Sequence, residues 1–328
     1  MILKNSRRVF LCTSALFATA LVLFMVFNSC KSTIGKKPDS NFGGVQIGAI
    51  SYSWRSMPCT AEDILKYCIQ SGISSVELMG NAAEQYAGIP SVPPRSERGT
   101  EMSEEERSRY RMAVEEARKK QTEWRLSVSM DKYKELRKLF NDAGVNIHIV
   151  KFAPENWSNE EIDYAFRAAK ILGAEGISDE IGHDACKRLG KFAEKHDMYA
   201  IFHNHLQPGD PDFSFDDFLG YSPNNMLNFD VGHYFGATGQ HPNGVIERLH
   251  DRIFSLHIKD KTGNNSEPAN KNLPWGEGET PLAEILNLIK KNNWKIYCDI
   301  ELEYEIPESS DAVNETTKCV EYCRNILL

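Results

Sequence analysis

The chain has 328 residues, with 38 Lys and Arg against 46 Asp and Glu, and a formal net charge of −8. Hydrophobic residues make up 41% and charged residues 26%. This composition is typical of a globular protein and excludes disordered, collagen-like and polytopic membrane proteins. We expect no nucleic-acid partner, because nucleic-acid-binding proteins need a basic face that displaces counterions from phosphates.

The first thirty residues combine a basic start with an apolar stretch. Three basic residues precede the apolar positions 9–27, which is the order of a secretory signal peptide. The apolar stretch nearly reaches the length that spans a bilayer, so an uncleaved membrane anchor is the alternative. In both cases we expect the rest of the chain to lie outside the cytoplasm. Removing the three basic residues lowers the net charge from −8 to −11.

The pair Ser29-Cys30 resembles the cleavage site of a bacterial lipoprotein, with Cys30 as the lipidated residue. We therefore predict a signal peptide over 1–29 and a flexible tether over 30–44. The predicted location is the periplasm or the outer membrane, with membrane contact only through the N-terminal lipid anchor. Six further cysteines follow without a C-x-x-C pair, and we expect free thiols there.

From residue 45 onward, short apolar runs alternate with amphipathic helical segments. This alternation favours a parallel sheet, and eight repeats favour a single α/β domain, a (β/α)8 TIM barrel over 45–328. An open doubly wound sheet is the alternative, but no G-x-G-x-x-G follows the first strand. The predicted strands are 46–51, 75–79, 146–152, 174–179, 198–203, 226–230, 253–258 and 295–301. The predicted helices are 60–70, 130–142, 159–172, 184–196, 214–219, 245–250, 281–291 and 312–326.

One connection breaks this period, the insertion over 81–129 after the second strand. It is too long for an ordinary βα loop, begins with Pro and Gly, and continues as a charge-rich helix over 103–124. Because it leaves the carboxyl end of a strand, where barrel sites form, we expect either a solvated helix or a lid or wall of the site.

Polar side chains gather where the predicted strands end, at the face that carries the active site in a (β/α)8 barrel. Converging carboxylates and imidazoles would repel or desolvate one another without a cation. We therefore expect a divalent metal, and the mixed nitrogen and oxygen donors suit Mn²⁺, Zn²⁺, Co²⁺ or Fe²⁺. The strand-end residues, from the third strand to the eighth, are Lys151, Glu180, His203, His205, Asp230, His233, His257, Lys259, Glu301 and Glu303.

Four short runs in this region resemble the xylose-isomerase-like TIM-barrel superfamily of sugar isomerases and epimerases. The resemblance extends over nearly all of 45–328, and the combination of runs is more specific than any one of them. The runs are Phe229-Asp230-Val231-Gly232-His233, Leu256-His257-Ile258-Lys259-Asp260, Gly276-Glu277-Gly278 and Ile300-Glu301.

The resemblance implies a metal held by Glu, Asp, His and Glu from successive strand ends. By position, Asp230, His257 and Glu301 match the last three of these ligands, and Glu303 is an alternative to Glu301. The resemblance also implies that the histidine of the Asp-x-x-His spacing, His233, contacts substrate.

The first glutamate of that ligand set is missing, since the fifth strand ends in His203-Asn204-His205. Two assignments are open. Glu180 supplies the carboxylate with His205 near it, or a histidine of the fifth strand binds the metal. Replacing one of two carboxylates by histidine weakens the case for a strict epimerase.

The chemistry that we predict is proton abstraction next to the carbonyl of a non-phosphorylated sugar or glycoside. His203 or Glu303 is the predicted general base, and Lys151 or His233 is predicted to hydrogen-bond the substrate oxygens. Return of the proton gives an isomerase or epimerase, whereas loss of a β-substituent gives a lyase, and water addition gives a hydratase. Exported relatives with a similar fifth strand resemble enzymes that act on 3-keto-glycosides by elimination.

Three further residues are predicted to contact the substrate. Trp54 and its neighbour Tyr52 lie in a predicted loop on the site face, where a ring would stack on a sugar or pack against the loop. Glu77 ends the second strand and would bind a hydroxyl or remain solvated. Lys259 follows His257 by two residues, which places it near the predicted ligands.

Two other classes of function are open. The first is a metal-dependent nuclease of the endonuclease IV type, which the acidic charge opposes. The second is a non-catalytic sugar-binding lipoprotein, which predicts that Asp230, His257 and Glu301 lie too far apart to share a metal.

Overall fold

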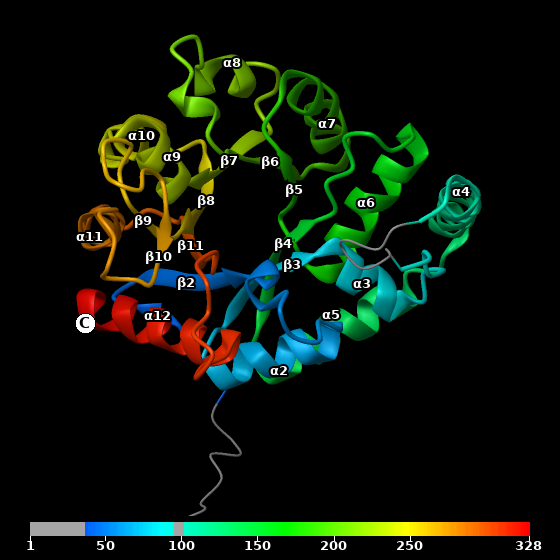
Figure 1. The fold of residues 1–328 in the computed structure, drawn as a ribbon, viewed down its shortest axis with the longest axis horizontal. Helices are drawn as coiled ribbons and strands as arrows, with labels where there is room; N and C mark the ends of the chain where they lie inside the picture. Colours follow the sequence, from blue (N-terminus) through cyan, green and yellow to red (C-terminus); the bar gives the residue numbers. More distant parts are fainter. Residues whose placement is uncertain (1–36, 95–101) are drawn as a thin grey trace, which may run out of the picture. The chain divides into compact units, whose positions relative to one another are not determined.

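The computed structural model describes residues 37–94 and 102–328, so the predicted signal peptide and Cys30 lie outside the described residues. Eight parallel strands close into a barrel with helices around it (Figure 1). The strand order is β2-β11-β8-β7-β6-β5-β4-β3, and pairing of β2 with β3 closes the ring. The predicted TIM barrel is therefore confirmed.

The barrel strands lie within two residues of their predicted positions, because each is a short apolar run bounded by polar residues. Three two-residue strands were not predicted: β1, which pairs with β2, and β9 and β10, which pair with each other. The strands are β1 Asn41–Phe42, β2 Val45–Ile50, β3 Ser75–Met79, β4 Asn146–Lys151, β5 Gly176–Glu180, β6 Tyr199–His203, β7 Asn225–Asp230, β8 Ile253–Ile258, β9 Asp260–Lys261, β10 Asn272–Leu273 and β11 Tyr297–Ile300.

The helices follow the predicted order, with local signals at their ends. In α2, Thr60 and Asp63 form a capping box, and Gly72 ends the helix with a φ of 77°. Helices α3 and α9 were not predicted. The helices are η1 Ser51–Trp54, α2 Ala61–Ser71, α3 Gly80–Ala87, α4 Glu104–Ser127, α5 Asp131–Ala143, α6 Asn159–Leu172, α7 His183–His196, η2 Gln207–Gly209, α8 Phe215–Leu219, α9 Val231–Thr238, α10 Asn243–Leu249, α11 Leu282–Asn292 and α12 Ala312–Leu327.

The end of the predicted tether over 30–44 is part of the barrel instead. Phe42 is buried and pairs with Val45 across the antiparallel β1–β2 hairpin. Ser40 is also buried, and its hydroxyl donates to the carbonyl of Ile47 over 2.6 Å. The polar composition of this segment suggested a linker, but burial of Phe42 and the backbone pairing outweigh that composition.

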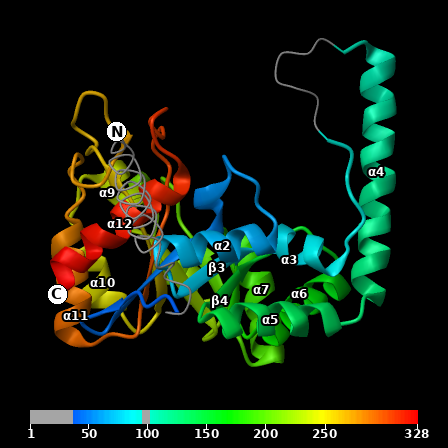
Figure 2. The same cartoon turned by 90° about the horizontal axis from the view of Figure 1, so that it is seen from below.

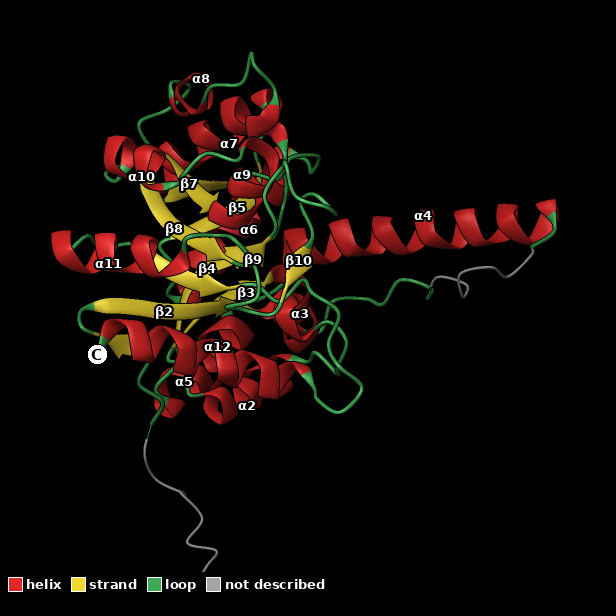
Figure 3. Ribbon diagram, turned by 60° about the vertical axis from the view of Figure 1, so that its left-hand side comes forward, coloured by secondary structure: helices red, strands yellow, loops and turns green. Residues whose placement is uncertain are grey.

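The insertion over 81–129 contains α3 and the long helix α4. The carboxyl-terminal turns of α4 are fixed to the barrel by Arg125, which contacts Glu84 at 2.7 Å and Glu161 at 3.1 Å. The amino-terminal part of α4 projects away from the barrel, as two further views show (Figures 2 and 3). The charge-rich helix predicted over 103–124 is confirmed as α4.

Apolar side chains fill two separate regions. The large core lies between the strands and the surrounding helices, and a small cluster of Ile149, Ile201 and Phe254 lies apart from it. Inward-facing polar residues extend this small cluster. His148 is fully buried and contacts Ser75 and Asp299, each at 2.8 Å.

Six cysteines lie in the described part of the chain and all are free, as predicted. Burial raises the pKa of several of these thiols, that of Cys68 among them. Among residues 37–94 and 102–328, no helix is long and apolar enough to cross a membrane.

Gly48 in β2 leaves room for the buried carboxylate of Asp299. A Cβ atom at position 48 would lie 2.0 Å from Oδ1 of Asp299. We expect Gly48→Ala to lower the free energy of unfolding by about 1–3 kcal/mol, because the carboxylate has to shift within a packed interior. Chemical denaturation measures this loss.

The matched control is Gly244→Ala in α10, where a Cβ atom meets nothing within 4 Å. This variant should be as stable as the original chain or slightly more so, because alanine favours helix. Equal stability of the two variants would contradict the packing argument.

Candidate active site

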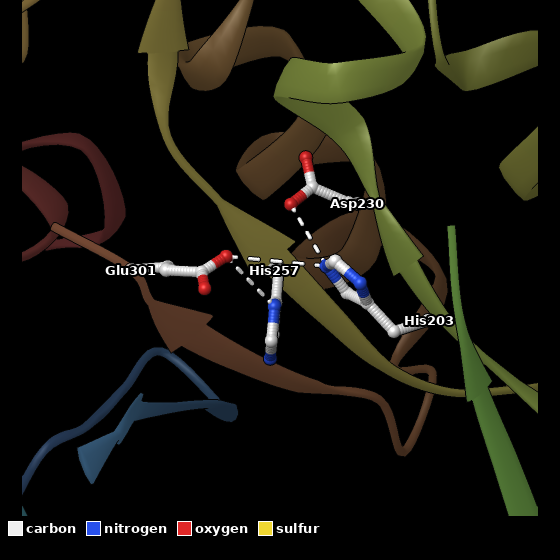
Figure 4. Close-up of side chains that lie close together, drawn as sticks. All are labelled: His203, Asp230, His257 and Glu301. Carbon is white, nitrogen blue, oxygen red and sulfur yellow. Dashed lines mark hydrogen bonds and ion pairs between the residues drawn. The ribbon is translucent and has the colours of Figure 1, made fainter. Parts of the chain in front are cut away.

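Four side chains from successive strands meet at the carboxyl end of the barrel. His203 ends β6, Asp230 ends β7, His257 lies in β8 and Glu301 follows β11. One potential ligand atom from each lies within 4.8 Å of the others (Figure 4). Parallel strands of a closed barrel bring these side chains to one point, although they are far apart in sequence.

Asp230 has two structural roles at this point. Its Oδ1 accepts the backbone N–H of His233 over 2.6 Å and so caps α9. Its Oδ2 faces His203 at 3.2 Å and Lys259 at 2.9 Å. Burial alone would raise the pKa of Asp230, but Lys259 and His233 lower it well below its usual range. Asp230 is therefore held as a carboxylate with a fixed orientation.

His257 is held between two carboxylates. Its Nδ1 lies 3.0 Å from Glu301 and its Nε2 lies 2.8 Å from Glu77. Burial would lower the pKa of His257, but Glu301 and Glu77 raise it to about 10. The raised pKa favours the protonated ring, in which each nitrogen donates a hydrogen bond to one carboxylate.

Glu77 lies beneath the site and not on its surface. It is fully buried and accepts hydrogen bonds from Ser178 at 2.6 Å and Asn228 at 2.9 Å. Burial would raise its pKa, but His257 lowers it to about 2. The structure thus corrects the prediction that Glu77 binds a substrate hydroxyl, because its two oxygens orient His257 and the polar layer below.

Lys259 supplies the positive charge that this cluster of acids requires. Its Nζ lies 2.9 Å from Asp230, 2.7 Å from Glu301 and 2.6 Å from Glu303, and its side chain is 2% exposed. Burial would lower the pKa of Lys259, but the three carboxylates raise it above its usual range. Burial would likewise raise the pKa of Glu303, which His233 and Lys259 lower to about 2. Lys259 and His233 thus lie on the interior side of these carboxylates.

A second group lies nearer to solvent and consists of Glu180, His203 and His205. Glu180 contacts His203 at 3.1 Å, His205 at 3.0 Å and Lys151 at 2.7 Å. Burial would raise the pKa of Glu180, but the hydrogen bonds from His203 and His205 and the charge of Lys151 lower it. His203 belongs to both groups, so the side chains form one continuous network.

A cavity of about 200 Å³ opens above these groups. Its wall includes six of the predicted site residues, whereas Asp230, His257 and Lys259 lie below its surface. None of the described residues of α4 lines it, so the predicted lid or wall is not formed by that helix. The lining residues are Ile50, Tyr52, Met79, Lys151, Glu180, His203, His205, Glu301 and Glu303.

Trp54 is placed in the core, in contrast to its predicted role in stacking on a sugar. The short helix η1 turns its indole inward against Tyr67, at 5.9 Å between ring centroids, and leaves the side chain fully buried. Tyr52, two residues earlier, is 40% exposed and lines the cavity instead. The guanidinium of Arg55 lies 4.4 Å from the Tyr52 ring.

The donors fit a transition-metal ion. Two imidazoles and two carboxylates converge, and this mixture suits Mn²⁺, Zn²⁺, Co²⁺ or Fe²⁺. The fourth member beside Asp230, His257 and Glu301 is His203, and Glu180 belongs to the outer group. Binding of a cation by these donors requires the Lys259 ammonium to leave Oδ2 of Asp230 and Oε2 of Glu301. It also requires His257 to lose a proton, because only a neutral imidazole binds a metal.

Two supporting residues, Ser178 and Asn228, were missed in the sequence. Each lies two positions before a predicted strand-end residue, namely Glu180 and Asp230. Because residues two apart in a strand face the same side, this spacing was the available signal.

The comparisons with known proteins agree with this architecture. Residues 174–323 match the family model described as a xylose isomerase-like TIM barrel. The resemblance seen in the sequence is thus confirmed over this part of the chain. No curated protein sequence matches the chain.

Solved structures with the same fold cover most of the chain at low identity. A sugar phosphate isomerase/epimerase from Parabacteroides distasonis is 17% identical, covers 87% of this chain and 96% of its own, and has a TM-score of 0.54. The probable 3-DHS dehydratase AsbF from Bacillus anthracis is 15% identical, covers 84% of this chain and 99% of its own, and has a TM-score of 0.55. D-allulose 3-epimerase from Methylomonas sp. is 13% identical, covers 86% of this chain and 98% of its own, and has a TM-score of 0.53. At these identities the likeness concerns the fold.

The contacts of His257 predict a pH dependence of stability. Its pKa is raised from 6.5 to about 10 in the folded chain, so its contribution is complete below pH 6.5 and is lost as the pH rises toward 10. With a chelator present, the difference in unfolding free energy between the original chain and His257→Gln should therefore shrink from pH 6.5 to pH 10. Urea denaturation at several pH values measures this difference.

The matched control is His241→Gln, which removes a surface histidine that contacts Glu284. Its difference from the original chain should change little over the same range. A constant difference for His257→Gln would contradict the assigned ion pairs.

Proposed function

We propose that this chain is a metal-dependent enzyme that removes a proton next to the carbonyl of a non-phosphorylated sugar or glycoside, in the manner of an isomerase or epimerase. One observation carries the proposal. His203, Asp230, His257 and Glu301 converge directly below a cavity whose wall holds further acid–base groups. The xylose isomerase-like family match and the neighbours named as isomerases, epimerases and a dehydratase support an enzyme of this kind.

The convergence also separates this proposal from a non-catalytic sugar-binding lipoprotein. That alternative requires Asp230, His257 and Glu301 to be too far apart to share a metal, and their ligand atoms lie within 4.8 Å. A nuclease remains disfavoured by the net charge of −8.

We assign proton removal to Glu303. Among the carboxylates at the cavity, Glu301 belongs to the inner ligand group and Glu180 is engaged by Lys151 and two histidines. Glu303 lines the cavity and lies outside both groups. His233 and Lys259 lower the pKa of Glu303 to about 2, so this carboxylate is ionised and able to accept a proton.

We assign proton return to His205, which follows β6 on the same cavity wall. Its hydrogen bond with Glu180, at 3.0 Å, raises the pKa of the imidazole and so favours the protonated form. Lys151 lines the cavity as well and is placed to donate a hydrogen bond to a substrate oxygen. A divalent ion on the inner donors would supply Lewis-acid stabilisation of the enolate.

The cavity favours a small polar substrate. Its volume of about 200 Å³ lies below the range of about 300–1,000 Å³ that is typical of pockets for drug-sized ligands. Among the described residues that line it, there is no arginine to bind a phosphate bidentately. We further propose that the enzyme is exported and anchored through Cys30. This places it outside the cytoplasm, where free sugars and glycosides are accessible.

A second candidate is a lyase or hydratase that acts on 3-keto-glycosides by elimination. One observation favours it: His203 lies in the inner group where an epimerase needs a second carboxylate on the opposite face of the substrate. Elimination needs one base and one acid, and Glu303 with His205 provides that pair.

Solvent isotope exchange tests the proposed proton abstraction. In D2O with Mn²⁺, free ketoses and 3-keto-glycosides should acquire deuterium next to the carbonyl, detected by mass spectrometry. Glu303→Gln should lower the exchange rate by about 100- to 10,000-fold, because it removes the base. The control is Glu62→Gln on the exposed surface of α2, which should exchange normally.

The product distinguishes the two candidates. Exchange with recovery of a saturated isomer supports the isomerase, whereas release of the aglycone supports elimination. Turnover of such a substrate without any deuterium incorporation would reject enolisation.

The position of Lys259 predicts opposite effects on metal binding and turnover. Lys259→Met removes the ammonium that contacts Asp230 and Glu301 at 2.9 and 2.7 Å. We expect Mn²⁺ to bind at least about tenfold more tightly, since two carboxylates lose their competing cation. The exchange rate should fall, because the positions of Glu301 and Glu303 are no longer fixed. Isothermal titration calorimetry measures the affinity.

The matched control is Lys261→Met. Lys261 is also buried, but its Nζ lies 3.5 Å from His233 and contacts none of these carboxylates within 4.0 Å. Weaker Mn²⁺ binding by Lys259→Met than by the original chain would contradict a shared position for the ammonium and the metal.

A further inference from the structure

The outer group of Glu180, His203 and His205 has the geometry of a metal site of its own. Oε2 of Glu180 lies 3.1 Å from Nδ1 of His203 and 3.0 Å from Nε2 of His205. One potential ligand atom from each of the three residues lies within 4.8 Å of the others. Ligand atoms about 2.1 Å from a tetrahedral ion lie about 3.4 Å apart, so these side chains need only small movements to surround one ion.

The carboxylate oxygen that faces the two histidines is not the one that accepts from Lys151. The ammonium of Lys151 donates to Oε1 of Glu180 over 2.7 Å, so it orients the carboxylate and leaves Oε2 directed at the imidazoles. In the inner group, by contrast, Lys259 contacts the oxygens of Asp230 and Glu301 that face the histidines. An ion in the outer group therefore displaces protons from two imidazoles, and no ammonium has to move.

The outer group is open to the cavity. The side chains of Glu180 and His205 are 44% and 50% exposed, and these two residues line the cavity wall together with His203. Two histidines and one glutamate, with a fourth position open to water, are a donor set that zinc enzymes use. An ion from solvent can therefore reach these ligands, and a water molecule can complete its coordination.

The second ring nitrogen of His203 orients this residue for an ion in the outer group. Nε2 of His203 lies 3.2 Å from Oδ2 of Asp230 (Figure 4). A metal-binding histidine commonly donates its other ring N–H to a carboxylate, which fixes the tautomer and the orientation of the ring. When Nδ1 of His203 binds the ion, its Nε2–H donates to Asp230 in this manner.

We propose that Glu180, His203 and His205 form a second metal site, which binds Zn²⁺ and is distinct from the inner group. The ligands are one carboxylate oxygen and two imidazole nitrogens. The inner group keeps its two carboxylates and His257, which still provide three ligands for an ion of their own.

Occupation of this site has a consequence that rests on the proposed function. Nε2 of His205 cannot hold a proton while it binds an ion, and this imidazole is the group assigned to proton return. Zn²⁺ in the outer site therefore inhibits turnover, and the concentration of free Zn²⁺ regulates the enzyme.

Zinc titration of the metal-free full-length chain by isothermal titration calorimetry tests the site. His205→Gln and Glu180→Gln should each lose one Zn²⁺ site per chain or weaken it by at least about 100-fold, because loss of a ligand costs more than loss of a residue that only orients one. Circular dichroism verifies that each variant is folded.

Two variants serve as controls. Glu301→Gln removes a ligand of the inner group and should retain the outer site. His241→Gln removes a surface histidine that contacts Glu284 and should bind as many ions as the original chain.

The rate of deuterium exchange measures the inhibition. With Mn²⁺ present, Zn²⁺ at about ten times the dissociation constant of the outer site should lower the exchange rate of the original chain by about tenfold. In Glu180→Gln, the same Zn²⁺ concentration should leave the remaining exchange rate unchanged. This comparison separates the outer site from displacement of Mn²⁺ in the inner group, which would slow both chains.

Three outcomes would overturn the second site. They are an original chain that binds no Zn²⁺, full Zn²⁺ binding by both His205→Gln and Glu180→Gln, and loss of the same site in either control variant. Equal inhibition of the original chain and Glu180→Gln would overturn the inhibitory role. Loss of the site in His205→Gln with retention in both controls supports the second ion even where no substrate exchanges deuterium, and in that case only the proposed function fails.

Discussion

The structure of the site depends on charge neutralisation among side chains that are largely removed from water. Asp230, Glu301 and Glu303 share the single ammonium of Lys259, and His257 is shared between Glu301 and Glu77. Buried carboxylates remain ionised only when cations and hydrogen bonds replace their hydration. The arrangement of the strand ends therefore follows from electrostatics as much as from packing.

The carboxylate oxygens of Asp230 and Glu301 that contact Lys259 are also potential metal ligands. The ammonium of Lys259 contacts Asp230 and Glu301, two of the residues that would hold a metal, so the two cations would compete for these carboxylates. A bound metal would transfer the ammonium toward Glu303 and His233, where it contacts atoms already within 3.1 Å. Metal binding and the state of the proposed base are thereby coupled through one side chain.

Much of this site could be predicted from the sequence, because parallel topology determines where strand ends meet. The resemblance to the xylose-isomerase-like superfamily singled out Asp230, His257 and Glu301 among the strand-end residues, and the parallel topology explains why they meet. The choice between Glu180 and His203 could not be made, since it depends on which side chain reaches the centre. Trp54 was likewise predicted to lie in a loop on the site face. Its burial depends on the single turn η1, which exposes Tyr52 and buries the indole, and the sequence carries no clear signal for such a turn. The β1 hairpin was missed since two-residue strands carry no periodic signal.

The polar filling of the barrel affects how stability responds to temperature. Inward-facing His148, Asp299, Glu77 and Asn228 are fully buried, in place of the branched aliphatic layers that usually fill such barrels. On unfolding, exposed apolar area raises the heat capacity by about 0.45 cal/K/mol per Å², whereas polar area lowers it by about 0.26. The barrel interior thus offsets part of the heat-capacity change that arises from the layer between strands and helices. The stability curve of this chain is accordingly flatter than that of a barrel of equal size with an aliphatic interior.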